Sequence, residues 1–149
     1  MIFIGIDPGT SGGLAYVTDE DNDCGYAALG KLTEREIHLL VKDICDLSDT
    51  DPCAVIELVH SSPQMGVKSA FTFGRSYGFL RGVLAANRVR YVEVRPQAWQ
   101  KAMGCLTKGD KNVSKAKAQQ LYPGEKVTHA TADALLLATY ARRYHKDLF

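Results

Sequence analysis

The 149-residue sequence has no long apolar run. No stretch approaches the ~18 consecutive apolar residues that a membrane-spanning helix needs. The opening segment from Met1 to Asp7 is too short for a secretory signal and has no basic lead. We therefore expect a cytoplasmic protein with no membrane partner.

The sequence also lacks any Cys-x-x-Cys pair. Its four cysteines, Cys24, Cys45, Cys53 and Cys105, are scattered along the chain. Zinc sites usually show short Cys or His spacings, so this pattern argues against one. We interpret the cysteines as free thiols in a reducing compartment.

There is little net charge, only +1 at pH 7, but the charges are unevenly distributed. Ten acidic residues face three basic ones between Asp19 and Asp51, whereas eight basic residues face two acidic ones between Arg88 and Lys117. A polyanion would be attracted to the second region and repelled by the first. Two solvated faces that merely differ in charge are the plainer interpretation.

Hydrophobic residues make up 46% of the chain, enough for the core of one domain. Thr33 and Glu36 form a capping-box pattern at the start of a helix. Strands are predicted at 1–6 (ending at Asp7), 14–17, 25–29, 54–58 and 90–94. Further helices are predicted at 67–87, 96–103, 113–121 and 129–144. A polar turn is predicted at 19–23, and loops at 60–66 and 108–111. This order predicts one α/β domain over residues 1–149, with a mixed five-stranded sheet and helices on both faces.

Three acidic residues stand where acids are rare. Asp7 ends an apolar strand, Glu57 lies inside another, and Asp133 lies in a helix that is apolar almost all round. A buried carboxylate costs several kcal/mol unless it is paired or bound to a metal. Taken singly, they have other interpretations: a turn residue, a solvent-facing strand end and a helix-start acid. Together they indicate a site for a hard cation such as Mg²⁺, which favours carboxylates and can activate water for phosphodiester hydrolysis.

His129 precedes Asp133 by four residues, so both are predicted on one helical face. A histidine there would bind a metal or steer a water molecule. The alternative is an ordinary residue at a helix N-terminus.

Several ordered motifs resemble those of one protein family, the RuvC-like Holliday junction resolvases, and its small phage-type members above all. The matching segments are Ile4–Gly13 (IGIDPGTSGG), Val55–Glu57, Ser69–Gly78 (SAFTFGRSYG), Val94–Trp99 (VRPQAW) and His129–Ala138 (HATADALLLA). They follow one another over nearly the whole chain, which makes the set specific.

The resemblance implies a ribonuclease H-like fold, a homodimer, and paired nicks across four-way and other branched DNA junctions. It implies four acidic metal ligands for Mg²⁺, with Mn²⁺ as a substitute. Asp7, Glu57 and Asp133 match three of them. The fourth ligand position lies four residues before Asp133. Phage-type members look to carry an acid there, whereas this chain has His129. If the gene is carried by a phage, the cytoplasm is that of the host.

The same resemblance gives the basic region a role in binding DNA. Lysines before the last helix would contact phosphates, and Lys111 and Lys115 are the candidates for a role in catalysis. A solvated helix face is the alternative. The candidate DNA-binding residues are Lys108, Lys111, Lys115, Lys117, Arg75 and Phe73.

The helix predicted at 67–87 contains aromatic residues and a periodic glycine pattern. Phe71, Phe73 and Tyr77 include candidates for stacking on an unpaired base, although core packing is the more common role of each. We interpret Trp99, outside this helix, as a packing residue. Glycines recur every four residues, at Gly74, Gly78 and Gly82, and predict close packing against the sheet or against a second subunit.

Other functions compatible with these residues are a ribonuclease H-like nuclease for flaps or RNA–DNA hybrids and a non-catalytic junction-binding module. Sugar kinases and actin-like ATPases also open with Asp-x-Gly-Thr. They need a second domain, for which we expect no room in 149 residues.

Overall fold

The computed structural model describes residues 1–20 and 23–149. Residues 21 and 22, which include Asp21 of the acidic region and part of the predicted turn, lie outside that description. The strands are β1 (Ile2–Asp7), β2 (Gly13–Thr18), β3 (Cys24–Ala28), β4 (Cys53–Glu57) and β5 (Arg90–Val94). The helices are η1 (Leu29–Lys31), α1 (Glu34–Cys45), α2 (Val67–Ala86), α3 (Pro96–Ala102), α4 (Lys111–Leu121), α5 (His129–Arg143) and α6 (His145–Leu148).

The strands form one mixed sheet in the order β3-β2-β1-β4-β5. The first three strands make an antiparallel meander, while β4 pairs parallel with β1 and β5 parallel with β4. The parallel pairs are possible because α1 and α2 carry the chain back between strands. The mixed five-stranded sheet predicted from the sequence is thereby confirmed.

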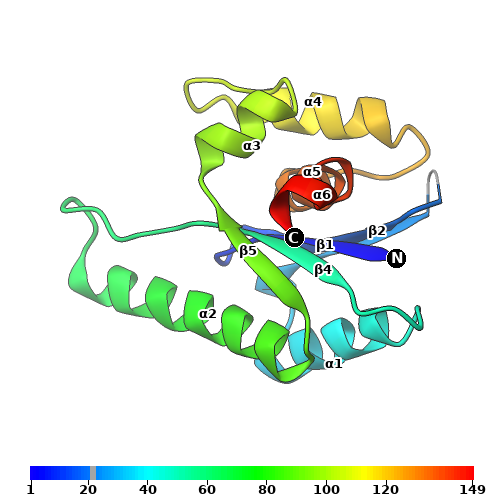
Figure 1. Ribbon diagram of the computed structural model, residues 1–149. Coiled ribbons are helices and arrows are strands. Elements are labelled where there is room, and N and C mark those ends of the chain that lie inside the picture. The colour runs from blue at the N-terminus through cyan, green and yellow to red at the C-terminus, as the bar shows by residue number, and fades with distance from the viewer. Residues whose placement is uncertain (21–22) are drawn as a thin grey trace.

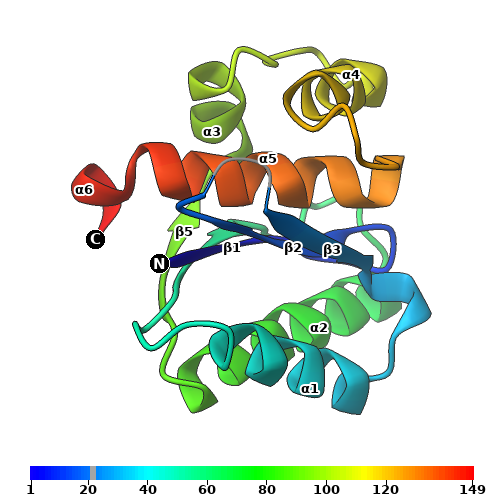
Figure 2. The ribbon, with the colours of Figure 1, turned by 90° about the vertical axis from the view of Figure 1, so that its right-hand side faces the viewer.

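Helices cover both faces of the sheet, as predicted (Figures 1 and 2). Helices α1 and α2 lie on one face, α5 lies directly on the other, and α3 and α4 lie beyond α5. Side-chain alternation along β1 separates two apolar cores. Ile2, Ile4 and Ile6 belong to the core under α1 and α2, whereas Phe3 belongs to the core under α5.

Helix α5 packs unusually close to the sheet. A Cβ atom added to Gly5 would lie 2.2 Å from the carbonyl oxygen of Ala134, and one added to Gly13 would lie 2.3 Å from that of Ala130. Only glycine leaves room at these two strand positions. The Tyr122 hydroxyl, 2.7 Å from the hydroxyl of Thr139, joins α4 to α5.

Local signals placed the helix ends well. The predicted capping box is present, because the Glu36 carboxylate accepts from the backbone N–H of Thr33 and the Thr33 hydroxyl accepts from that of Glu36. Helix α4 begins two residues before the predicted position, at Lys111, because Asp110 caps it by accepting from the Asn112 N–H. Helix α6 lies beyond the last predicted element.

The glycine pattern of α2 does not pack on the sheet. A Cβ atom added to Gly74, Gly78 or Gly82 would meet no atom within 4 Å among the residues that the structure describes. The structure thus contradicts close sheet packing as the reason for these glycines. Phe71 and Val67, on the same helix, are 72% and 88% exposed.

The four cysteines are free thiols, with Cys53 and Cys105 buried. Across residues 1–20 and 23–149, no helix combines the length and apolar character of a membrane span.

Candidate metal centre

Two of the three predicted acids end neighbouring parallel strands. The paired residues of β1 and β4 run up to Ile6 and Ile56, so Asp7 and Glu57 follow side by side at the same edge of the sheet. Asp7 lies four residues after Phe3 on β1, and Glu57 lies two residues after Val55 on β4. Phe3 and Val55 both belong to the α5 core. The side chains of Asp7 and Glu57 therefore belong to the face that α5 covers.

The third acid, Asp133, is placed over this edge by the close packing of α5. Ala130 lies against Gly13, which pairs with Asp7 across the β1–β2 ladder, and Ala134 lies against Gly5. Asp133 lies between these two contacts, in the first turns of the helix. The structure thus brings together Asp7, Glu57 and Asp133 from three separate elements.

The three carboxyl groups lie near enough to influence one another's ionisation. Burial, followed by repulsion from Glu57 and Asp133, raises the pKa of Asp7 to about 8, although Lys111 acts in the opposite direction. Each carboxylate thus makes ionisation of Asp7 harder, which is the expected behaviour of like charges in a poorly solvated site.

The other two carboxyl groups are also harder to ionise than usual. Burial raises the pKa of Glu57, opposed by a hydrogen bond from Trp99 and reinforced by the charge of Asp133. Burial raises the pKa of Asp133, opposed by a hydrogen bond from Ser114 and by the charges of Lys111 and His129. A cation placed among these groups would favour their ionised forms.

The acids are near neighbours rather than a tight cluster. Among residues 1–20 and 23–149, no group of three His, Cys, Asp or Glu side chains is gathered closely enough to form a ready-made metal cluster. Magnesium suits the looser arrangement, because it keeps several water molecules and takes only one or two carboxylates directly in many sites. The all-oxygen chemistry of the trio fits magnesium better than a soft metal.

Two further predicted residues lie beside the acids. His129 is the first residue of α5, one turn before Asp133, and its charge acts on that carboxyl group. Lys111 is the first residue of α4, and its charge acts on both Asp7 and Asp133. Lys111 thereby brings positive charge to the edge of the carboxylate site.

The remaining predicted lysines form a basic surface next to it. Lys115 and Lys117 are half-buried on α4, and Lys108 is exposed in the loop before it. Helix α4 carries no acidic residue at all. The structure connects only Lys111 of this group with the carboxyl groups.

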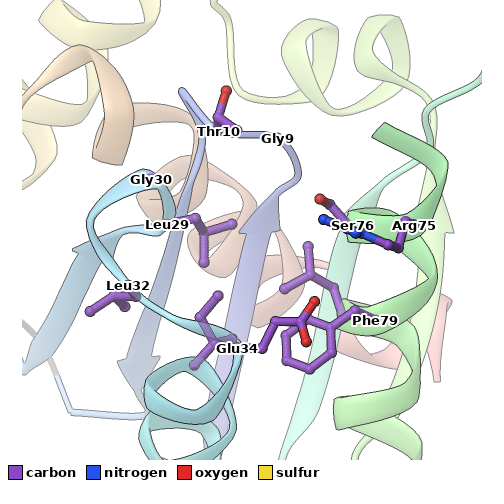
Figure 3. Close-up of a pocket in the computed structure, with 11 residues that line it drawn as sticks. Gly9, Thr10, Leu29, Gly30, Leu32, Glu34, Arg75, Ser76 and Phe79 are labelled. Atoms are coloured by element: carbon purple, nitrogen blue, oxygen red, sulfur yellow. The ribbon is translucent and has the colours of Figure 1, made fainter. Parts of the chain in front are cut away.

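Arg75 and Phe73 lie on α2, beside the turn that follows Asp7 and away from the lysines of α4. Arg75 lines a hollow of about 230 Å³ between α2 and the segment from Leu29 to Glu34 (Figure 3). Phe73 lines an adjoining hollow, and a Cβ atom on Gly9 would lie 3.3 Å from its ring. Neither hollow is lined by the three acids, so we assign the chemistry to the open sheet edge.

Sequence reasoning missed two hydrogen-bond donors to the acids. The Trp99 indole Nε1 donates to Oε2 of Glu57 at 2.7 Å, and Ser114 bonds to Asp133. Trp99 is fully buried, which confirms the packing role predicted for it. A buried indole N–H usually has a hydrogen-bond partner, so a packing role for Trp99 could have prompted a search for its acceptor.

Comparisons with known proteins place this geometry in a known fold. No family model matches the chain, and no curated protein matches it. Solved structures do match it, among them two of RuvC. One is Thermus thermophilus RuvC, with a TM-score of 0.67 and 19% sequence identity, covering 99% of this chain and 96% of that one. The other is T. thermophilus RuvC in complex with a Holliday junction substrate, with a TM-score of 0.69, 18% identity, and 99% and 96% coverage.

The protein therefore has an α/β fold built on a mixed five-stranded sheet. More narrowly, its fold is like that of RuvC, with the match covering almost the full length of both chains.

Proposed function

We propose that this protein is a magnesium-dependent endonuclease that resolves four-way and other branched DNA junctions by paired nicks. The observation that carries the proposal is the trio Asp7, Glu57 and Asp133, which are partly buried, mutually repelling and placed at one edge of a RuvC-like sheet. One of the similar structures contains a Holliday junction substrate, which supports branched DNA as the ligand. The ordered sequence motifs support a relationship to phage-type resolvases.

The three carboxylates would hold magnesium, and Mn²⁺ in its place. The bound metal would supply an activated water and neutralise charge on the phosphate. The raised pKa values of the three acids support this role, because buried like charges are costly until a cation compensates them.

The neighbouring cationic residues act on the DNA. Lys111, close to Asp7 and Asp133, donates hydrogen bonds to a non-bridging oxygen of the scissile phosphate. His129, in the first turn of α5, would orient a water molecule or complete the ligand set when the metal is bound. Lys108, Lys115 and Lys117 neutralise flanking phosphates and set the position of the duplex arms, while Arg75 and Phe73 contact DNA beyond the Asp7 turn.

Paired nicks require two active sites, and we propose a homodimer. The exposed glycine face of α2, at Gly74, Gly78 and Gly82, is our candidate for the contact. Glycines in a helix interior lower helix stability, and here no part of the described chain packs on them. A second copy of α2 would use the space that they leave.

The test is a cleavage panel with four-way junction, fork, flap, RNA–DNA hybrid and linear duplex, each with and without magnesium. We expect symmetric nicks in the junction, dependence on the metal, and little cutting of linear duplex and hybrid. Equal cutting of all five substrates would identify a less selective ribonuclease H-like nuclease. Tight junction binding with no cutting at any metal concentration would contradict catalysis.

A further inference from the structure

The hydrogen bond between Trp99 and Glu57 joins α3 to the end of β4. The donor and acceptor are 2.7 Å apart, a short distance for an N–H···O contact and typical of a charged acceptor. The two residues are 42 positions apart in sequence, so the contact depends on the tertiary fold. It links α3, in the layer beyond α5, to the carboxylate edge.

Trp99 is held rigidly enough to act as a fixed donor. Its side chain is 0% exposed and packs in the α5 core beside Met103 and Cys105. Helix α3 begins at Pro96, which fixes the backbone one turn before the indole. An indole has two side-chain torsions and a single N–H, so packing determines where that N–H points.

The chemical nature of the donor favours metal binding. An indole N–H only donates and carries no charge, so it orients a carboxylate without neutralising it. One oxygen of Glu57 is engaged by Trp99, which leaves the second oxygen and the negative charge available to a cation. A lysine or arginine in the same place would compete with the cation instead.

A neutral hydroxyl also acts on Asp133. Ser114 on α4 is 6% exposed and donates to this carboxylate. A hydroxyl is also a neutral donor. Two of the three acids thus each accept from an uncharged donor, supplied by α3 or by α4.

We propose that Trp99 is a positioning residue of the metal site, which fixes the orientation of the Glu57 carboxylate through its indole N–H so that the free oxygen faces the cation. The inference rests on the proposed function and adds a residue to it. Hydrogen-bond partners of metal ligands typically contribute 10- to 100-fold in metal affinity or activity.

The first test uses the fact that the chain contains a single tryptophan. The protein therefore has one indole ¹H–¹⁵N resonance, which can be followed without any variant. We expect it to exchange slowly with water and to shift as Mg²⁺ is added to the DNA-free protein, with the shift lost in Asp7→Asn. A resonance that stays fixed while Mn²⁺ binding to the same protein is detected by electron paramagnetic resonance would overturn the proposal.

The second test removes only the donor. Biosynthetic replacement of Trp99 by 3-benzothienylalanine puts sulfur in place of the N–H at nearly the same volume. The measurement is the dissociation constant for Mn²⁺, together with the metal concentration for half-maximal cutting. We expect both to rise roughly 10- to 100-fold, with cutting recovered at high metal concentration.

The matched control is Tyr122→Phe. It removes the 2.7 Å hydrogen bond between the hydroxyls of Tyr122 and Thr139, which is buried in the same core, and leaves the acids unchanged. We expect it to lower thermal stability and to leave Mn²⁺ affinity unchanged. Unchanged Mn²⁺ affinity in the benzothienylalanine protein, with wild-type binding and cutting intact, would overturn the positioning role alone. A wild-type protein that neither binds Mn²⁺ nor cuts a junction would overturn the proposed function as well.

Discussion

The two helical layers on the sheet differ in the side chains that they bury. The layer of α1 and α2 covers an apolar core built on Ile2, Ile4 and Ile6. The buried polar residues of the described chain, Ser114, Thr131 and Thr139, all lie on α4 and α5 on the other side. We assign no chemistry to the α1–α2 core, whereas the α5 side combines apolar packing with three acids that repel one another.

This contrast shows how a small domain can support a costly site. Stability is a small difference between large terms, and the like charges of the acids reduce it. Apolar residues are buried on both faces, whereas the three acids belong to the α5 face alone. Changes on the two faces should therefore have separable consequences.

The largest expected effect comes from Asp7→Asn on the α5 side. In the proposed mechanism, loss of one carboxylate would remove metal-dependent stabilisation worth several kcal/mol, so we expect cutting of a four-way junction to fall roughly 10³-fold or more. Junction binding should persist, as measured by gel shift in calcium. Wild-type cutting by the variant would show that the acids of this edge are not the active site.

The pH dependence of stability should distinguish the same face. Below the ordinary Asp pKa of 3.8 the folded and unfolded chains both carry the Asp7 proton. Between there and the folded pKa of about 8, only the folded chain keeps it, so stability of the metal-free protein falls as pH rises and levels off above about 8. Thermal melts from pH 5 to 8 should show this fall, and Asp7→Asn should weaken it. An identical slope in the variant would contradict the shifted pKa.

A truncation in the other core should affect stability alone. Leu84 on α2 is fully buried, so Leu84→Ala should lower the free energy of unfolding by about 2–5 kcal/mol. Chemical denaturation measures this loss. At a temperature where the variant is folded, its cutting rate and its metal requirement should match those of the wild type. A changed metal requirement would mean that the two faces are coupled.

Lys111→Ala tests the cation nearest the acids. We expect cutting to fall roughly 10²-fold, because a charged donor to the scissile phosphate is lost. The slope of the logarithm of the binding constant against the logarithm of salt concentration should become shallower by about 1, the value for one phosphate contact. The control is Lys42→Ala on α1, whose ammonium pairs with Asp46 2.9 Å away, and we expect it to cut normally. Equal losses in both variants would indicate a general charge effect.

The smallest expected effect is that of Gly78→Ala on the exposed face of α2. In an isolated subunit, alanine should stabilise the helix by about 1 kcal/mol. In a dimer that packs two α2 helices together, the same methyl group should weaken association. Sedimentation velocity and thermal melts at two concentrations separate these effects. A more stable protein with unchanged association would place the dimer contact elsewhere.

Local and periodic signals made most of the fold predictable. The capping box at Thr33, the strand pattern ending at Asp7 and the apolar final helix each depend on neighbouring residues, and each is present in the structure. The trio of acids was also predictable, because a carboxylate in an apolar segment is unusual wherever the segment lies. The structure brings the three together.

Long-range contacts were not predictable in the same way. The bond from Trp99 to Glu57 and the packing of α5 on Gly5 depend on how distant segments meet, which no local spacing encodes. The glycines of α2 left two alternatives in sequence, and only the structure removed one of them. Helix α6 is a single turn, too short for periodicity to reveal.

The seating of α5 on Gly5 and Gly13 has a consequence for the order in which the protein is made. Residues 7 and 57 leave the ribosome long before residue 133, and segments near the N-terminus generally fold first. The strands carrying Asp7 and Glu57 can pair while α5 is still being synthesised. The nascent chain therefore holds only part of its carboxylate set, which becomes complete only when α5 docks on the sheet.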